Sequence, residues 1–415
     1  MKHSKVLHFP IILFLLHFYG CNNNNLQKEN SQSLENVTNN SINLFSPCKT
    51  YNNSISNISD SVKFIKLESS TNCMLSDNTV DVEITDKFIL IAEMFGIYQF
   101  DISGKFIRHI GRTGRGSNEY PQVNGMQIDQ SLNLIYVFAG KKNGELLIYD
   151  FAGNFKNRIC FHDNKYSDFN LVNSNLLALH PSCFERLEKG YKKLCFIDIQ
   201  GNKVASSSSQ LFPLEDSNKR VQCLGPSRNW SWTHNNKLFF LECGNDTIYH
   251  INTTSLIPQW ILKGELKLSM SELMYSKNSS EIKGKINLID KNIINDNSAV
   301  FESDNFLLFR CSNGEDTYFY TYDKKENKGC RTNYEKTNKM DYFIDNIISG
   351  IYFNPEFKSG NNMIAFLNIY DLKKQKTNIS DFLQGHYSKQ GTHLLDMVIN
   401  ASETDNPILM VVKFK

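Results

Sequence analysis

The chain has 415 residues, of which 45 are Lys or Arg and 43 are Asp or Glu, and its formal net charge is +2. Two of the positive residues, Lys2 and Lys5, precede an apolar run near the N-terminus, and the rest of the chain is electrically balanced. A balanced chain has no general electrostatic attraction to nucleic acid or to an anionic bilayer. We therefore expect no nucleic-acid partner, and after the N-terminal run no apolar segment is long enough to be a membrane helix.

The first twenty residues have the pattern of an export signal. A short positive region precedes a mostly apolar run, Val6 to Phe18, which is too short to span a bilayer. Phe18-Tyr19-Gly20-Cys21 resembles a lipobox, the site at which a bacterial lipoprotein is cut before a lipidated cysteine. We expect residues 1–20 to be a lipoprotein signal peptide and Cys21 to carry the lipid. The alternative is an ordinary signal peptide with a chance cysteine, because Tyr19 is bulky where a small residue is usual.

Residues 21–61 form a segment rich in Asn and Ser, which begins with consecutive asparagines at 22–25. Such a segment cannot bury enough apolar surface to order itself, so the sequence predicts a flexible tether. A tether of this kind would hold a folded domain away from the membrane to which a lipid attaches it.

Ten cysteines are scattered along the chain, and no Cys-X-X-Cys pair occurs among them. This spacing argues against a zinc site and against a thioredoxin-like redox motif. A large core does not need disulfides, so we expect most cysteines other than Cys21 to be buried free thiols that pack as small apolar side chains.

The body of the chain, residues 62–415, reads as short strands joined by tight turns. One turn occurs three times, as Asp101-Ile102-Ser103-Gly104, Asp150-Phe151-Ala152-Gly153 and Asp198-Ile199-Gln200-Gly201. The aspartate can accept hydrogen bonds from the backbone ahead of it, and the glycine adopts the positive φ that closes a hairpin. A period of about 45–50 residues with four strands per unit is typical of a β-propeller.

Later copies of the repeat are weaker, at Ile248–Ile251 and at Tyr320–Asp323. The spacing between these two copies is long because residues 264–297 read as a partly helical insertion. Residues 379–402 contain two further helical segments near the end of the chain.

Two strands have no hairpin partner, Val62–Leu67 near the start of the body and Ile408–Phe414 at its end. We predict that they pair with each other and close a ring, because closure removes exposed sheet edges. The predicted fold is therefore all-β: a six-bladed β-propeller of four-stranded antiparallel blades, closed by its N- and C-terminal strands.

Four stretches of the body are distinctive: Val62–Glu68, Gly104–Tyr120, Asn245–Tyr249 and Asp405–Lys415. The second is the most specific, because it contains Gly-Arg-Thr-Gly-Arg-Gly. Together these stretches resemble the six-bladed β-propeller lipoproteins common in the Bacteroidota, relatives of the NHL-repeat and TolB-like propellers. The resemblance covers nearly the whole mature chain and implies a six-bladed ring on a lipid anchor. It does not imply a particular reaction.

The glycine- and arginine-rich loop between the first two predicted blades is one candidate ligand site. Arg112 and Arg115 offer forked donors to a carboxylate or phosphate, with Glu119 and Tyr120 beside them. The loop is not a P-loop, because no Gly-Lys-Ser/Thr follows. The alternative, which we favour, is that the arginines tie neighbouring blades together through Glu119 while Tyr120 packs in the seam.

Trp230 and Trp232 are a second candidate, because residues two apart on a strand face the same side. Two indoles on one side could form a flat platform for sugar rings. Tryptophans of this kind more often fill a core, and the sequence does not separate these alternatives.

A metal site in the central channel is a third possibility. Six-bladed lactonases and related enzymes hold a metal there on Glu, Asn and Asp side chains from different blades, and Glu83, Asp129 and Asp345 can be nominated by analogy with them. One sequence does not distinguish these residues from ordinary carboxylates at strand ends. The chain has no His-Glu-X-X-His and no Gly-X-Ser-X-Gly motif.

Two functions follow from these observations. The first, which we favour, is a lipid-anchored binding or scaffold protein of the cell envelope, expected at the outer membrane, that recognises a glycan, a peptide or a partner protein on the propeller face. It is non-enzymatic and needs no cofactor. The second is a metal-dependent hydrolase or lyase with its site in the propeller channel, for which calcium is the candidate ion. A propeller fold by itself implies neither function.

Overall fold

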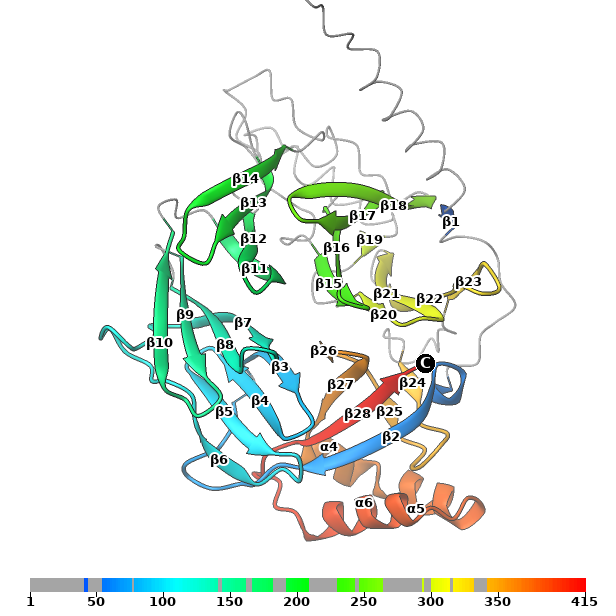
Figure 1. Cartoon of the computed structure of the whole chain (residues 1–415). Helices are drawn as coiled ribbons and strands as arrows, with labels where there is room; N and C mark the ends of the chain where they lie inside the picture. The colour runs from blue at the N-terminus through cyan, green and yellow to red at the C-terminus, as the bar shows by residue number, and fades with distance from the viewer. Residues whose placement is uncertain are drawn as a thin grey trace, which may run out of the picture.

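The computed structural model describes residues 41–43, 54–76, 78–140, 144–161, 166–181, 192–208, 230–242, 246–263, 293–294, 300–313, 316–331 and 342–415. Within these ranges the chain is mostly β, and six four-stranded antiparallel blades stand in a ring (Figure 1). The predicted six-bladed β-propeller is therefore confirmed.

The first three blades follow one another directly, each running from its innermost to its outermost strand. Blade 1 consists of β3 (Thr79–Ile84), β4 (Phe88–Glu93), β5 (Gly96–Asp101) and β6 (Phe106–His109). Blade 2 consists of β7 (Val123–Asp129), β8 (Leu134–Ala139), β9 (Glu145–Asp150) and β10 (Phe155–Cys160). Blade 3 consists of β11 (Tyr166–Asn173), β12 (Leu176–Pro181), β13 (Lys192–Asp198) and β14 (Lys203–Ser208).

The last three blades carry additions to the basic unit. Blade 4 consists of β15 (Trp230–His234), β16 (Lys237–Leu241), β17 (Thr247–Asn252) and β18 (Ser255–Lys263). Blade 5 consists of β20 (Phe301–Glu302), β21 (Phe306–Asn313), β22 (Asp316–Asp323) and β23 (Lys328–Arg331), and β19 (Ile293–Ile294) also pairs with β21. Blade 6 consists of β26 (Phe357–Ser359), β27 (Asn362–Leu367), β28 (Ile408–Phe414) and β2 (Ser59–Lys66). Before blade 6, β24 (Phe343–Ile344) and β25 (Tyr352–Phe353) form a small hairpin.

The repeated turn joins the third and fourth strands of the first three blades. In blade 1, Oδ1 of Asp101 accepts hydrogen bonds from the backbone N–H of Ser103 (2.8 Å) and of Lys105 (3.0 Å). Gly104 has φ +91°, where a Cβ would clash with the carbonyl of Lys66. The copies in blades 2 and 3 repeat this pattern, so the sequence motif is a structural unit of the hairpin.

The ring closes as predicted from the sequence. β2 pairs antiparallel with β28 in a register that places Val62 opposite Val412 and Ile65 opposite Leu409. Blade 6 thus combines one strand from the start of the body with three from its end (Figure 1). Closure in this manner pairs the two ends of the body within one blade, with β2 as its outermost strand.

The apolar core is divided among the seams between neighbouring blades, with one buried cluster at each of the six seams. At the seam of blades 1 and 2, for example, Leu90 and Ile97 pack with Val137 and Leu147. Each blade therefore buries both of its faces, which explains why strands such as β4 are apolar at nearly every position.

The folded body begins earlier than the sequence predicts. β1 (Ser41–Asn43) adds a parallel strand to β18, and Ile42 is fully buried between blades 4 and 5. A 3-10 turn at Ile55–Asn57 precedes β2 and buries Ile55. The predicted tether, residues 21–61, is therefore wrong over these stretches, because isolated apolar side chains in a polar segment contact the core. The predicted signal peptide and Cys21 lie outside the described residues.

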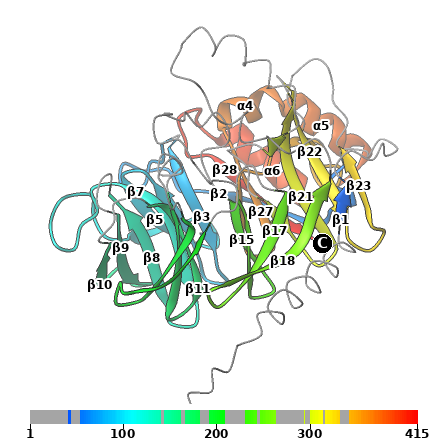
Figure 2. The same cartoon turned by 90° about the horizontal axis from the view of Figure 1, so that it is seen from above.

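Three helices lie between β27 and β28 in the chain and are grouped on one side of the ring (Figure 2): α4 (Ile369–Lys374), α5 (Lys376–Gly385) and α6 (Lys389–Asn400). Side chains cap two of them, since Asn368 accepts from the N–H of Tyr370 and Ser388 from that of Gly391. The helical segments expected within 379–402 fall in α5 and α6. The expected insertion at 264–297 lies outside the described residues except for β19. None of the helices in the described ranges could span a membrane.

Candidate functional site around the ring axis

The first strand of each blade lies nearest the ring axis, and side chains from these strands join one blade to the next (Figure 1). Asp81 on β3 accepts a hydrogen bond from the N–H of Met126 on β7 (3.3 Å). Gln127 on β7 donates to a carbonyl of β11 (3.2 Å) and accepts from an N–H of the same strand (2.8 Å). Ser359 on β26 accepts from the N–H of Ile84 on β3 (2.8 Å). Polar side chains thus connect blades 6, 1, 2 and 3 around the axis.

Three half-buried carboxylates, Asp81, Glu83 and Asp168, lie on these inner strands. Glu83 accepts a hydrogen bond from Oγ of Ser359 (2.7 Å), and Oδ1 of Asp168 lies 3.5 Å from where a Cβ of Gly125 would stand on β7. None of the three forms an ion pair with another described residue. Asp81 and Glu83 are two apart on one strand, so they share a side of it.

Burial has the largest effect on the pKa values of Glu83 and Asp81. It raises the pKa of Glu83 to about 7, against the opposing effects of the Ser359 hydrogen bond and the charge of Lys358. Burial also raises the pKa of Asp81 well above its usual value, and the charges of Glu83 and Asp168 raise it further. Desolvation disfavours the ionised form of a carboxyl, and a neighbouring negative charge acts in the same direction. At the axis, the carboxyl group of Glu83 is therefore only partly ionised near neutral pH.

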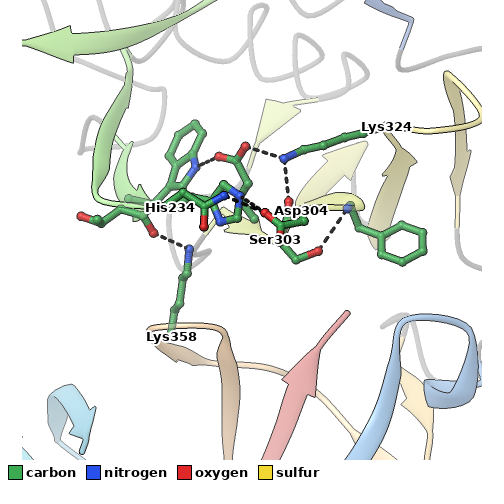
Figure 3. Close-up of polar contacts among 10 residues, drawn as sticks. His234, Ser303, Asp304, Lys324 and Lys358 are labelled. Atoms are coloured by element: carbon green, nitrogen blue, oxygen red, sulfur yellow. Dashed lines mark hydrogen bonds and ion pairs between the residues drawn. The ribbon is translucent and has the colours of Figure 1, made fainter.

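The inner strand β26 carries a positive charge on Lys358. Its ammonium group reaches past blade 5 and donates to the carbonyl of Thr233 on β15 (3.0 Å), as Figure 3 shows. Burial lowers the pKa of Lys358 to about 8, while the charges of Glu302 and Glu83 raise it and that of Lys324 lowers it. The Lys358 side chain thus connects blade 6 to blade 4 at the axis.

Blades 4 and 5 are joined by a buried charged network (Figure 3). The carboxylate of Glu302, 1% exposed, accepts from Nε1 of Trp232 and from Nζ of Lys324 (2.7 Å). Lys324 also donates to the carbonyl of Ser303 (2.6 Å) and lies 5.5 Å from the centre of the Trp260 ring. Buried charges are tolerated when they are paired and hydrogen-bonded in this way. We interpret this network as a structural connection between the two blades.

A second polar contact lies beside that network. Nε2 of His234 is 3.2 Å from Oδ1 of Asp304, and the side-chain amide of Asn235 donates to the same oxygen (2.7 Å). Burial lowers the pKa of His234, although the charges of Glu302 and Asp304 act against this. This contact fixes the first turn of blade 4 against the first turn of blade 5.

The axial groups can act together as a polar binding site. Carboxyl groups lie on the side of blades 1 to 3, and one ammonium group extends from blade 6 to blade 4. When ionised, the carboxylates accept hydrogen bonds from hydroxyl or amine groups, and when protonated they can also donate. This set suits a ligand with several hydroxyl, amide or amine groups. Across the residues that the structure describes, no three His, Cys, Asp or Glu side chains are placed to hold a metal ion.

The glycine- and arginine-rich loop lies at the seam between blades 1 and 2. Glu119 accepts from the N–H of Gly116 (2.8 Å), and Tyr120, 1% exposed, donates to the carbonyl of Ile110 (2.8 Å). Both side chains therefore hold the loop in shape. Arg112 and Arg115 are exposed, and their guanidinium groups form no hydrogen bond or ion pair with the other described residues, although the carbonyl of Arg112 accepts from the N–H of Tyr120 (3.0 Å).

The arginine that ties this loop to blade 2 is Arg158 on β10, which the sequence did not single out. It donates to the carbonyl of Ser117 (2.8 Å) and pairs with Glu145 (3.1 Å). Tyr120 is thus buried at the seam, Glu119 bonds within its own loop, and the arginine that contacts the loop is Arg158. The free guanidinium groups of Arg112 and Arg115 leave a ligand role for these two residues as a prediction.

Trp230 and Trp232 lie inside the protein, 8% and 4% exposed, in the cluster between blades 4 and 5. The Trp232 ring stacks on Phe239 with 5.7 Å between ring centres. Their placement agrees with the alternative that these tryptophans fill a core, and it leaves little indole surface for a sugar ring.

The three carboxylates nominated as metal ligands lie in different surroundings. Glu83 is at the axis, as described above. Asp129 accepts from the N–H of Ser131 (2.9 Å) in the first turn of blade 2. Asp345 is fully buried and accepts from Oγ of Ser349 (2.6 Å) and from two backbone N–H groups, so it organises its own turn. Glu83, Asp129 and Asp345 are not brought together.

The ring and its axial residues define a six-bladed β-propeller with a polar axis. The chain belongs to the family described as "Domain of unknown function (DUF4934)", whose model matches residues 39–413. A search of the curated proteins finds no match.

Two solved structures are similar to this chain. A Bacteroides fragilis protein described as exported is 18% identical over 86% of this chain and 95% of its own, with a TM-score of 0.64. A member of the DUF4221 family from Bacteroides vulgatus is 12% identical over 86% of this chain and 97% of its own, with a TM-score of 0.49. At this level of identity the similarity of the first structure supports the fold and nothing further.

Proposed function

We propose that the protein is a lipid-anchored, non-enzymatic binding or scaffold protein of the cell envelope that recognises a glycan, a peptide or a partner protein at the ring axis. The observation that carries the proposal is the set of half-buried carboxylates, Asp81, Glu83 and Asp168, that have no ion-pair partner in the described ranges. Burial of unpaired acids opposes folding. Acids with perturbed pKa values, such as Asp81 and Glu83, are often found at functional sites.

The chemistry of the axis favours a ligand with many hydroxyl, amide or amine groups. Asp81 and Glu83 can exchange hydrogen bonds with such groups, and Lys358 can donate to a ligand oxygen in place of the Thr233 carbonyl. A glycan or a peptide presents these groups along its length. A partner protein could present them on a loop that enters the axis.

The anchor is supported by the lipobox-like sequence before Cys21 and by the polar segment after it. β1 begins at Ser41, so the chain between Cys21 and blade 4 would link the lipid to the ring. The outer membrane is our proposed location, and the exported neighbour from Bacteroides fragilis is compatible with it. A Cys21→Ser substitution should move the protein from the membrane fraction to the soluble fraction, and unchanged fractionation would contradict the anchor.

The binding proposal can be tested on arrays of envelope polysaccharides, peptidoglycan fragments and peptides. We expect the full chain to bind one class, and the double variant Asp81→Asn, Glu83→Gln to bind it at least tenfold more weakly. Asp86→Asn is a matched control, because Asp86 is an exposed carboxylate on the next turn of the same blade. Equal binding by the double variant and the control would show that the axis is not the site, and no binding by the wild type would count against the function itself.

A further inference from the structure

A cavity of about 560 Å³ lies between blade 6, blade 1 and helix α6, away from the side chains of the axial site. Its size is that of a small-molecule site. α6 lies along β2 on the outer side of the ring, so the helical insertion of blade 6 supplies one wall (Figure 1). The apolar side chains of the lining come from all three elements: Phe64, Ile65, Ile84, Ile89, Val411 and Met397.

Two lysines, Lys63 and Lys413, line the same cavity. Lys63 is opposite Val411 in the β2–β28 register, and Lys413 is opposite Ser61. Directly opposed residues share a face of the sheet, as do residues two apart on one strand. Lys63 and Lys413 are therefore diagonal neighbours on the face that borders the cavity.

These two lysines differ from the others on and beside the same strands. Lys66 pairs with Asp405 (3.4 Å), and Lys415, directly after β28, pairs with Asp60 (2.8 Å). Lys63 and Lys413 form no hydrogen bond or ion pair through their side chains with other residues in the described ranges. The two lysines that face the cavity are thus the unpaired ones, and neighbouring like charges repel unless an anion lies between them.

The remaining lining limits the charge and the shape of the ligand. Asp86 lines the cavity with one negative charge, so it and the two lysines leave a single net positive charge that suits a monoanion. His393 of α6 adds a polar ring, and Ile102, 55% exposed, adds apolar surface from blade 1. An apolar lining with a few placed polar groups is typical of sites for small organic ligands.

We propose that this cavity binds a small organic monoanion with an apolar body, such as a medium-chain carboxylate. The carboxylate lies between the ammonium groups of Lys63 and Lys413, where charge-assisted hydrogen bonds hold it. The apolar body packs against Met397 of α6 and the isoleucines of blade 1. Nothing in this site depends on the axial carboxylates, so it is independent of the function proposed above.

The test uses decanoate as the probe, with decylammonium and decanol as matched cationic and neutral probes. Isothermal titration of the full chain should show one decanoate site, with at least tenfold weaker binding of both other probes. The double variant Lys63→Gln, Lys413→Gln should lose at least tenfold in decanoate affinity. Lys66→Gln should bind as the wild type does, because Lys66 is on the same strand but outside the cavity.

Ile102→Asp gives an independent check on the apolar part of the site. Ile102 is exposed in a hairpin turn, so the substitution is compatible with folding, and the added charge should weaken decanoate binding. Melting temperatures of all variants would establish that they fold. The proposal is overturned if the wild type does not bind decanoate or if decylammonium binds equally well. It is also overturned if the Lys63→Gln, Lys413→Gln variant binds decanoate with the same affinity as Lys66→Gln. Glu83→Gln should leave decanoate binding unchanged, which separates this site from the axis.

Discussion

The charge on Glu83 should cost the protein stability above neutral pH, and Glu83→Gln should recover it. Burial raises the pKa of Glu83 from 4.5 to about 7. Between these two values the folded state holds a proton that the unfolded state has released. The free energy of unfolding therefore falls as the pH rises through this window and becomes level above it.

The size of the effect follows from the two pKa values. The difference between 4.5 and about 7 corresponds to about 3 kcal/mol at high pH. Glu83 is half-buried, so solvent water reduces the cost, and we expect a gain of about 1 to 3 kcal/mol for Glu83→Gln at pH 8. Below pH 4.5 the carboxyl is protonated in both states, so the substitution should have little effect there.

The assay is urea unfolding followed by tryptophan fluorescence at pH 4 and at pH 8, with Asp86→Asn as the exposed control. We expect Glu83→Gln to raise the unfolding midpoint at pH 8 and to leave it nearly unchanged at pH 4. The control should shift neither midpoint by much. Equal stability of Glu83→Gln and the wild type at both pH values, or a loss of stability that is greater at pH 8, would refute the account of burial given for this residue.

Three further substitutions test the connections between blades. Lys324→Met should lower the free energy of unfolding by about 3 kcal/mol in chemical unfolding, because it leaves the carboxylate of Glu302 buried without its ion pair. A loss below about 1 kcal/mol would show that the pair contributes little to stability. Arg158→Met should lower the free energy of unfolding by about 1 to 3 kcal/mol and speed proteolysis of the loop at 111–120. Unchanged cleavage would mean that Arg158 does not hold the loop. Leu409→Asp places a charge at a fully buried position of β28. It should prevent closure, seen as loss of the cooperative unfolding transition, whereas a normal transition would contradict the role of the β2–β28 pair.

The sequence predicted well the features that depend on neighbouring residues, and the strand pairing for which only one partner was available. The turn at Asp101 and Gly104 is specified by its own side chains, so its three copies revealed the period of the blades. The pairing of β2 with β28 could be inferred because both strands lacked a local partner. β1 was not predicted, because the few apolar residues around Ile42 lie in a segment rich in Asn and Ser, and the core that buries Ile42 is built by blades 4 and 5, which are remote from it in sequence.

The axial site was beyond the reach of sequence patterns, apart from the nomination of Glu83. Asp81, Glu83, Asp168 and Lys358 come from three blades, and only the ring brings their strands to one axis. The alternation of Asp81 and Glu83 in an otherwise apolar strand was the one available signal. The seam of blades 1 and 2 shows the same limit, because Arg158 contacts a loop that is remote from it in sequence.

Hydrogen–deuterium exchange of the full chain, measured with and without a total extract of envelope polysaccharides and peptides, tests the central claim most directly. We expect the extract to slow exchange in β3, β11 and β26, whose side chains form the axial site, and this protection should disappear in the Asp81→Asn, Glu83→Gln variant. Protection confined to strands far from the axis, or no protection at any concentration of the extract, would contradict the claim that the ring axis is a binding site.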